Sequence, residues 1–464
     1  MRPLTTASGD EQQDAEAAAR APGAPAPGEA SLSAIVARLT SVNVFVLALG
    51  LLTAPLMARA LGPEGRGAYA AVLAPLALAP SILTFGLPVF AAREAADKVS
   101  PGRILGSIAP LMIVVSIGCV CAAPWIADHF GQGRSEVRDP LLVGFTLSPV
   151  LLLSAITYGI VSGQQRWNRI IASRVAAALT GAVGIVTFYA LGHLTVSSAA
   201  FLFIAGSLLA AVPTASVLRG HGRFAYDRHL ARRALRFAPA AWLWQAGALT
   251  NSRIDQLLMV TMTSERQLGL YAVAVTIGNL CNVFIAAIGP ALLPRMVHGG
   301  QDLTPRAFRT TVVLTLLGVF PIGIAAPFVV PLLFGTAFED AVPMVWILLV
   351  AALPAAGRYV LTSALIASSL PRWAAIAEGS TVVVTVAGLL VLLPSLGGIG
   401  AGLVSLVAYT VALIILLFAA CRELGLPLSA FLTLQSGDVA VVAHRLRTSA
   451  ARARSALRSR RTDR

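Results

Sequence analysis

The chain has 464 residues and a formal net charge of +14, and 57% of its residues are hydrophobic while only 12% are charged. A soluble domain is typically about 25% charged, so this composition excludes an ordinary soluble protein. Apolar stretches of about 20 residues recur, and each is long enough to cross a hydrocarbon core about 30 Å thick. The sequence therefore predicts an all-α polytopic membrane protein.

The segment 1–32 differs from the rest of the chain, because it is rich in Pro, Ala and acidic residues and has little to bury. We expect it to be a disordered cytoplasmic N-terminal segment. It lacks the short basic start and the short apolar core of a signal peptide. The first apolar run, 33–60, has full spanning length, so we interpret it as a retained first transmembrane helix.

Apolar runs between charged or turn-forming residues predict about twelve transmembrane helices in two six-helix halves. The runs lie near 33–60, 67–92, 103–127, 140–162, 168–191, 196–218, 237–263, 267–294, 309–334, 341–369, 373–394 and 398–421. The N-terminal half, a basic cytoplasmic linker, the C-terminal half and a basic cytoplasmic tail are then 33–218, 219–236, 237–421 and 422–464.

The loops give the orientation, because cytoplasmic loops carry an excess of Lys and Arg. If the N-terminus is cytoplasmic, each inward loop is basic, with Arg93, Lys98, Arg103, Arg166, Arg169, Arg219, Arg223, Arg228, Arg232, Arg233, Arg236, Arg295, Arg306, Arg309 and Arg372. The outward loops hold only Arg59, Arg66, Arg134, Arg138 and Arg266. The alternation predicts an N-in, C-in protein. Since most of the net charge follows this rule, we expect no nucleic-acid partner.

The C-terminal tail ends in HRLRTSAARARSALRSRRTDR, which has eight arginines and one Asp. One interpretation is a solvated basic tail. The other is a helix on the membrane surface that binds anionic lipid of the inner leaflet, where each basic residue contributes about 1 kcal/mol.

A short motif occurs once in each half. The segments RGAYAAVLAP and RQLGLYAVAV place Gly67 and Tyr69 in positions equivalent to Gly269 and Tyr271. The glycine-rich turn LGPEG before the first copy follows no strand, so we interpret it as a turn and not as a phosphate loop. We expect the glycines to lie where backbones pack closely and the tyrosines to lie at the outer membrane interface.

Several blocks resemble one family of transporters. They are ARALGPEGRGAYAAVLAPLALAPSILTFGLPVFAAREAA, NSRIDQLLM, LGLYAVAVTIGN, AAIGPALLPRM, LFGTAFEDAVPMVWILL and LPSLGGIGAGLVSLVAYT. In this order they are similar to the polysaccharide-repeat flippases (Wzx type) of the multidrug/oligosaccharidyl-lipid/polysaccharide (MOP) exporter superfamily. The resemblance covers about 33–425, although many members of the family have fourteen helices.

The resemblance implies a flippase for an undecaprenyl-diphosphate-linked oligosaccharide. The glycan would enter a cationic cavity between the halves, the lipid tail would stay in the bilayer, and rocking of the halves would expose the glycan outside. The protein would not be an enzyme and would need no cofactor. Its partners would be the lipid-linked oligosaccharide and the polysaccharide-assembly machinery of the cytoplasmic membrane.

Charged residues within the spans are the first candidates for the site, because a charge at mid-membrane costs about 2.5–3.5 kcal/mol unless it faces a cavity or a partner. The acids well inside spans are Asp255 and Glu378, and the deepest arginines are Arg253 and Arg358. Arg358 would bind the anionic substrate or pair with Glu378 as a structural ion pair. A proton or sodium gradient would be coupled through Asp255 or Glu378.

The remaining candidates are weaker. Arg253 and Asp255 are two positions apart near the outer end of their span, so on a straight helix they project to different sides and would reach the membrane surface or the cavity. Arg38, Arg93 and Arg174 lie near cytoplasmic ends, where they would extend to the interface or form an inward-facing site for a diphosphate. Amides that would line the cavity or join helices are Gln245, Asn251, Asn279 and Asn282.

Three other functions stay open. A drug antiporter of the same fold would favour acids and aromatic residues in the cavity. A facilitator-superfamily transporter is weakly suggested by EAADKVSPGRILG. A membrane-embedded glycosyltransferase or polymerase would need a large outward loop, and the longest here is about 128–139. The cysteines Cys119 and Cys121 are two apart on one span, so they cannot bind one metal ion together.

Overall fold

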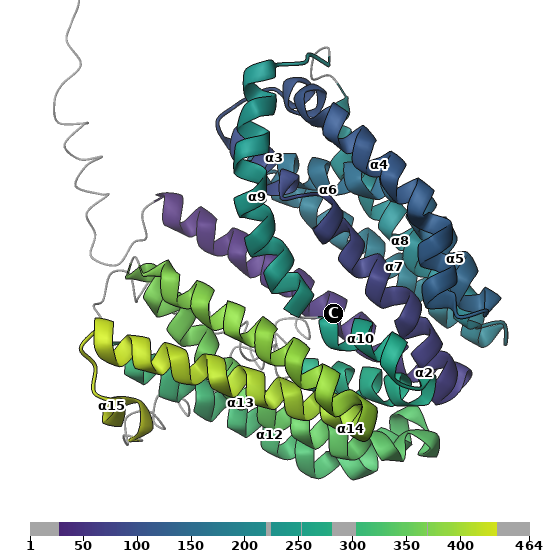
Figure 1. Ribbon diagram of the computed structural model, residues 1–464, viewed down its shortest axis with the longest axis vertical. Coiled ribbons are helices and arrows are strands. Elements are labelled where there is room, and N and C mark those ends of the chain that lie inside the picture. Colours follow the sequence, from purple (N-terminus) through teal and green to yellow (C-terminus); the bar gives the residue numbers. More distant parts are fainter. Residues whose placement is uncertain (1–26, 220–223, 252, 281–302, 369, 434–464) are drawn as a thin grey trace, which may run out of the picture.

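The computed structural model describes residues 27–219, 224–251, 253–280, 303–368 and 370–433. All regular secondary structure in this part of the chain is helical. Figure 1 shows two helical bundles, one from each half of the sequence, which meet at one end and diverge toward the other.

The described part of the N-terminal bundle contains eight helical segments. They are α2 (Pro27–Leu83), α3 (Leu87–Ala96), α4 (Pro101–Gly131), α5 (Ser135–Thr146), α6 (Ser148–Gly163), α7 (Trp167–Ala190), α8 (Val196–Ala215) and the 3-10 turn η1 (Ser216–Leu218). The described helices that follow are α9 (Arg228–Asn251), α10 (Ile254–Met262), a helix over 265–280, α12 (Leu303–Phe334), η2 (Thr336–Ala341), α13 (Val342–Ala367), α14 (Pro371–Glu423) and α15 (Leu428–Leu432). All but α9 lie in the C-terminal bundle, and the first turns of α9 pack against α3 and α4 of the N-terminal bundle.

The helices agree with a membrane protein of many spans. Among the described residues, seven helices are long and apolar enough to cross a membrane, or eight if α5 and α6, which are bent by 56°, form one span. Two of these seven helices each cover two of the spans that the sequence predicts. Helix α2 is interrupted only at Gly62 and α14 only at Gly397, and both glycines have a positive φ. The count of twelve spans and the N-in, C-in orientation remain predictions.

Several boundaries differ from the expected ones. Helix α2 begins at Pro27, inside the segment expected to be disordered, and residues 1–26 lie outside the described part. Helix α9 begins at Arg228, inside the expected linker. Asp227 accounts for this early start, because its carboxylate accepts hydrogen bonds from the backbone N–H groups of His229 and Leu230. Arg103 of α4 donates to the same carboxylate at 2.6 Å and holds the pKa of Asp227 below its usual value.

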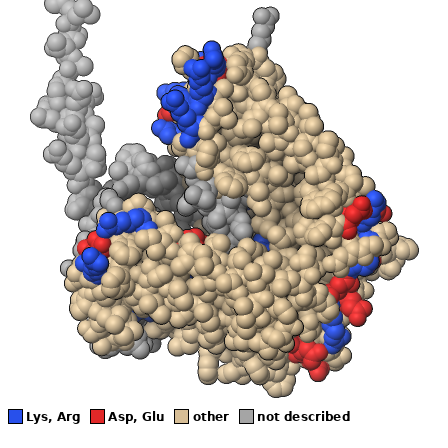
Figure 2. All heavy atoms as spheres, viewed as in Figure 1, with Lys and Arg blue, Asp and Glu red and all other residues tan. Residues whose placement is uncertain are grey.

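Charged side chains are gathered at the two ends of the bundles, and the faces between them carry almost no charge in Figure 2 and expose many large hydrophobic side chains. One end carries the pairs Arg103–Asp227, Arg233–Glu94 and Arg372–Glu423. The end where the bundles meet carries Arg134–Glu265, Arg138–Asp128 and Arg266–Asp340. We call the latter the repeat end, because Gly67 and Gly269 lie there, and the former the opposite end. A wide apolar band between two charged rims is the surface that a bilayer requires.

Candidate functional site

A cavity of about 990 Å³ lies between the two bundles. Its walls come from the second part of α2, α10, the helix over 265–280, α13 and α14. The lining runs from Arg66, near the repeat end, to Ile366 and Pro371, beside the α13–α14 turn at the opposite end. The cavity therefore extends along much of the length of the helices.

The bundles touch closely at the repeat end, and the two repeated glycines make this contact. A Cβ atom on Gly67 would lie 1.9 Å from the carbonyl oxygen of Glu265, and one on Gly269 would lie 1.9 Å from the carbonyl oxygen of Pro63. Neither position leaves room for a larger residue. The expectation that these glycines lie where backbones pack closely is confirmed.

Polar contacts reinforce the closure at the repeat end. Arg59 of α2 donates from Nε to the carbonyl oxygen of Leu333 at 2.9 Å. Gln132 donates to the carbonyl oxygen of Val260 at 3.3 Å, and Arg134 pairs with Glu265. Each of these contacts joins the N-terminal bundle to the C-terminal one.

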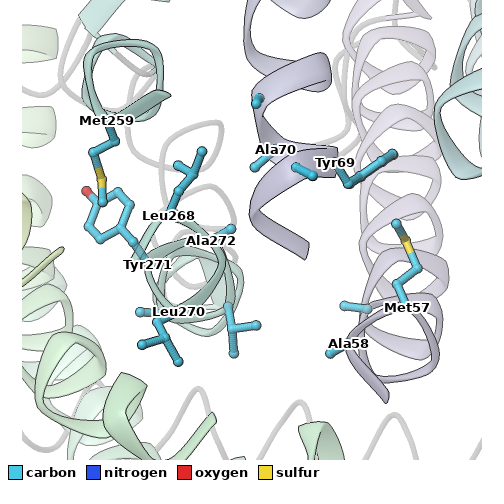
Figure 3. Packing of buried hydrophobic residues seen from close by; sticks show 14 of the residues in the cluster. Met57, Ala58, Tyr69, Ala70, Met259, Leu268, Leu270, Tyr271 and Ala272 are labelled. Carbon is cyan, nitrogen blue, oxygen red and sulfur yellow. The ribbon is translucent and has the colours of Figure 1, made fainter. Parts of the chain in front are cut away.

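The repeated tyrosines do not lie at the membrane interface, so that prediction is wrong. Tyr69 and Tyr271 are 8% and 0% exposed, and both line the cavity. Figure 3 shows them on α2 and on the helix over 265–280, pointing away from each other among buried apolar side chains. Close packing of the two glycines sets this helical turn of each bundle against the other bundle, so the tyrosines that follow face the interior of the protein and not the lipid.

Asp255 is held inside the protein by a hydrogen-bond network. The Tyr271 hydroxyl donates to Oδ2 of Asp255 at 2.5 Å, and the backbone N–H of Gln256 donates to Oδ1 at 2.7 Å. Arg253 donates to Oε1 of Gln256 at 3.2 Å. All four residues line the cavity.

The straight-helix expectation for this span is therefore wrong. Arg253 precedes α10 with φ −139°, so the run 237–263 is divided into α9 and α10 and is not one helix. The break lets Arg253 and Asp255 face the same cavity, although on a continuous helix they would project to different sides.

Arg358 and Glu378 form an ion pair across α13 and α14, with Nη1 and Oε2 2.9 Å apart. The guanidinium also lies 5.1 Å from the centre of the Tyr409 ring. The two side chains remain 23% and 33% exposed, and both line the cavity. The ion pair between Arg358 and Glu378, one of the two alternatives that the sequence allowed, is thus present. It leaves part of each charged side chain accessible from the cavity.

Arg66 is a cavity residue that the sequence reasoning placed in an outward loop. Its guanidinium lies 5.4 Å from the centre of the Tyr69 ring, and its Nη1 lies 3.7 Å from Sδ of Met57. Its Nε is buried without a hydrogen-bond partner. The cavity thus holds three arginines, Arg66, Arg253 and Arg358, and two acids, Asp255 and Glu378.

The other predicted site residues are dispersed. Arg38, Arg93 and Arg174 lie outside the cavity lining: Arg93 stacks on Phe237, and Arg174 donates to Oδ1 of Asn43. Asn279 lines the cavity. Three predicted amides lie where the structure describes no side chain, namely Gln245, Asn251 and Asn282.

The fold resembles solved membrane transporters. The lipid II flippase MurJ in its inward closed conformation has a TM-score of 0.71 and 15% identity, over 85% of this chain and 89% of that chain. An inward-facing multidrug resistance MATE family transporter of the MOP superfamily has a TM-score of 0.65 and 17% identity, over 83% of this chain and 98% of that chain.

A MOP superfamily transporter from Pyrococcus furiosus, described as having a binding pocket of reverse polarity, has a TM-score of 0.54 and 16% identity, over 86% of this chain and 96% of that chain. At identities this low, the structural similarity shows a shared fold and not a shared function. This fold is the MOP fold, so the comparison does not support a facilitator-superfamily transporter. Comparison with curated proteins gave no match.

The sequence itself identifies the family. Residues 34–299 match the family described as "Polysaccharide biosynthesis protein". This range is more than half of the 464-residue chain and includes Gly67, Asp255 and Tyr271. The chain belongs to the family of polysaccharide biosynthesis proteins, and its fold is that of the MOP exporters.

Proposed function

We propose that the protein is a flippase that moves a polyprenyl-diphosphate-linked oligosaccharide across the cytoplasmic membrane by alternating access. The observation that carries this proposal is the cavity, in which three arginines face two acids. One acid is paired with Arg358 and the other accepts a hydrogen bond from Tyr271, so Arg66 and Arg253 have no acid as an ion-pair partner among the described residues. Arginine forks bind phosphate oxygens in pairs, which suits a diphosphate.

The shape of the protein supports a mechanism. In the proposed orientation the repeat end faces outward and is closed by the glycine contact, while the bundles diverge toward the cytoplasm. A cavity of about 990 Å³ is at the upper end of the range for sites that hold small ligands, about 300–1,000 Å³. It would hold the diphosphate and the first sugars, while the polyprenyl tail stays in lipid. Separation of the repeat end would then release the glycan outside, where polysaccharide-assembly enzymes would receive it.

Removal of the arginines that lack an acidic partner tests this function. We expect Arg66→Gln and Arg253→Gln each to lower the rate at which proteoliposomes flip a labelled lipid-linked oligosaccharide by about 10- to 100-fold, since a hydrogen bond to a charged group contributes about 1.5–3 kcal/mol. Arg138→Gln, which removes an arginine from the protein surface at the repeat end, is the matched control. If both cavity variants flip the lipid at the rate of the control, the cavity does not bind the diphosphate.

The two acids support a second proposal, on coupling. Asp255 and Glu378 would bind a proton or a sodium ion that drives the return of the empty carrier. We expect Asp255→Asn with Glu378→Gln to abolish the dependence of flipping on an imposed pH or sodium gradient while the protein stays folded. Normal gradient dependence in this double variant would remove both carboxylates from coupling.

A drug antiporter is the alternative function, and the two acids of the cavity together with the MATE-like fold favour it. An antiporter would carry cationic dyes, and its transport would survive loss of the arginines. Efflux of a cationic dye that persists in Arg66→Gln and Arg253→Gln, together with no flipping by the wild-type protein, would establish this alternative.

A further inference from the structure

A second pocket lies in the N-terminal bundle, away from the transport cavity. Its volume is about 360 Å³. Its walls are the first part of α2, with Ile35 and Arg38, and the turn from α6 into α7, with Gln165 to Arg169 and Ile171. None of these residues lines the transport cavity.

The lining of this pocket is basic. Arg38, Arg166 and Arg169 contribute three positive charges, and no Asp or Glu is among the lining residues. None of the three has an ion-pair partner among the described residues, whereas Arg103, Arg233 and Arg372 at the same end of the protein are each paired with an acid. Nη1 of Arg169 is buried without a hydrogen-bond partner. The pocket thus gathers three positive charges that no acid of its lining neutralises.

The local backbone keeps these side chains together. Gln165 adopts a left-handed conformation with φ 55°, and the backbone N–H of Arg166 donates to the carbonyl oxygen of Val161 at 3.1 Å. This tight turn brings Arg166 and the first turn of α7 to the same side as Arg38. The N-terminus of α7 adds a partial positive charge to the pocket.

The position of the pocket points to a lipid. In the proposed orientation it lies at the cytoplasmic rim of the membrane-spanning band, and Trp167 is of the residue type that anchors at this boundary. Basic pockets between helices on the cytoplasmic side bind the head groups of anionic lipids. The pocket is much smaller than the transport cavity, so it fits a phosphate head group and not an oligosaccharide.

We propose that Arg38, Arg166 and Arg169 bind the phosphate of an anionic phospholipid from the cytoplasmic leaflet. The bound phosphate bridges the start of α2 to the start of α7 and so stabilises the N-terminal bundle. This inference rests on the proposed orientation, but it assigns a site separate from substrate transport.

Thermal unfolding in nanodiscs tests the site. We expect the wild-type protein to have a higher melting temperature in phosphatidylcholine mixed with phosphatidylglycerol than in phosphatidylcholine alone. Arg166→Gln with Arg169→Gln should lose more than half of this increase. Arg232→Gln with Arg236→Gln, which removes the same charge from exposed positions of α9, should keep it. Arg38→Gln removes one arginine from the facing helix and should lose part of the increase, which keeps the test valid if the double variant folds poorly.

Three results would overturn the proposal. The pocket variants could keep the full increase, the control could lose as much as the pocket variants, or inorganic phosphate alone could raise the melting temperature in phosphatidylcholine to the same extent. The last result would assign the pocket to a free anion. Failure of the flippase proposal would be distinguishable, because the lipid-dependent increase in melting temperature is measured without substrate.

Discussion

Two roles are proposed for Arg358, a structural ion pair and binding of the anionic substrate, and the observed pair with Glu378 excludes neither role. Its pairing with Glu378 at 2.9 Å and its contact with Tyr409 hold it between α13 and α14. Yet 23% of the side chain stays exposed to the cavity, so a diphosphate could share the guanidinium with the carboxylate. The structural role and the binding role therefore predict different outcomes only when both partners are changed together.

Changing the pair separates these roles. We expect Arg358→Ala and Glu378→Ala each to destabilise the protein by about 1–3 kcal/mol, the usual penalty of leaving one polar partner unsatisfied. The double variant should regain most of the stability, because buried pairs are often replaced together at little cost. It should still fail to flip a labelled lipid-linked oligosaccharide if Arg358 also binds the substrate. A double variant that regains both thermal stability and flipping would make the arginine purely structural.

The sequence predicted part of this site for a simple physical reason. Arg253, Asp255, Arg358 and Glu378 interrupt apolar runs, where a charge needs a cavity or a partner, and all four line the cavity. Arg66 was missed because it follows the turn LGPEG, where an arginine is expected to be a loop charge. In the structure, the C-terminal bundle covers this turn. The covering residues are two hundred positions away in the chain, so the local periodicity of the sequence gives no sign of the contact.

The helices also differ from local expectation in one consistent way. The turn expected near 60–67 shrinks to the single non-helical residue Gly62, and the one near 394–398 shrinks to Gly397. The break between α9 and α10 contains neither Gly nor Pro, since it falls in the segment Asn251 to Arg253. Hydropathy located the apolar runs well because the bilayer sets their length. The exact joints between helices depend on tertiary packing, which hydropathy does not measure.

The glycine contact between α2 and the helix over 265–280 gives a prediction at the scale of these elements. Gly67→Ala and Gly269→Ala would place a methyl group against a backbone carbonyl of the other bundle, at a cost of about 1–3 kcal/mol for an overpacked site. We expect the repeat end to open, shifting the equilibrium between conformations by about 5- to 150-fold. Spin labels at Ser135 and Thr336 should report a longer distance between the bundles.

A glycine elsewhere supplies the control for this test. Gly118 of α4 is exposed, and a Cβ atom added to it would have no neighbouring atom within 4 Å, so Gly118→Ala should leave the distance between the labels unchanged. If Gly67→Ala and Gly269→Ala also leave the distance and the transport rate unchanged, the closed repeat end does not depend on this contact.

At the scale of the whole molecule, the charged rims predict an orientation. Inward loops are expected to carry the excess of arginine, which assigns the opposite end to the cytoplasm. In a variant without native cysteines, Ser135→Cys and Thr336→Cys should react with an impermeant thiol reagent added outside the cell. Ser100→Cys, at the other rim, should react only after the membrane is permeabilised. The reverse pattern of labelling would invert the proposed direction of transport.

The contact at the repeat end is also symmetric. Gly67 meets Glu265, and Gly269 meets Pro63. Glu265 follows Pro63 by the same number of residues as Gly269 follows Gly67, so the two contacts are equivalent between the halves. Such a contact is isologous: it is the kind that two identical subunits make across a two-fold axis, with one patch meeting its own copy. Each half therefore presents to the other an equivalent turn, as two identical subunits would across a two-fold axis. In this respect the single chain closes its repeat end as a symmetric dimer would, with both patches supplied by one polypeptide.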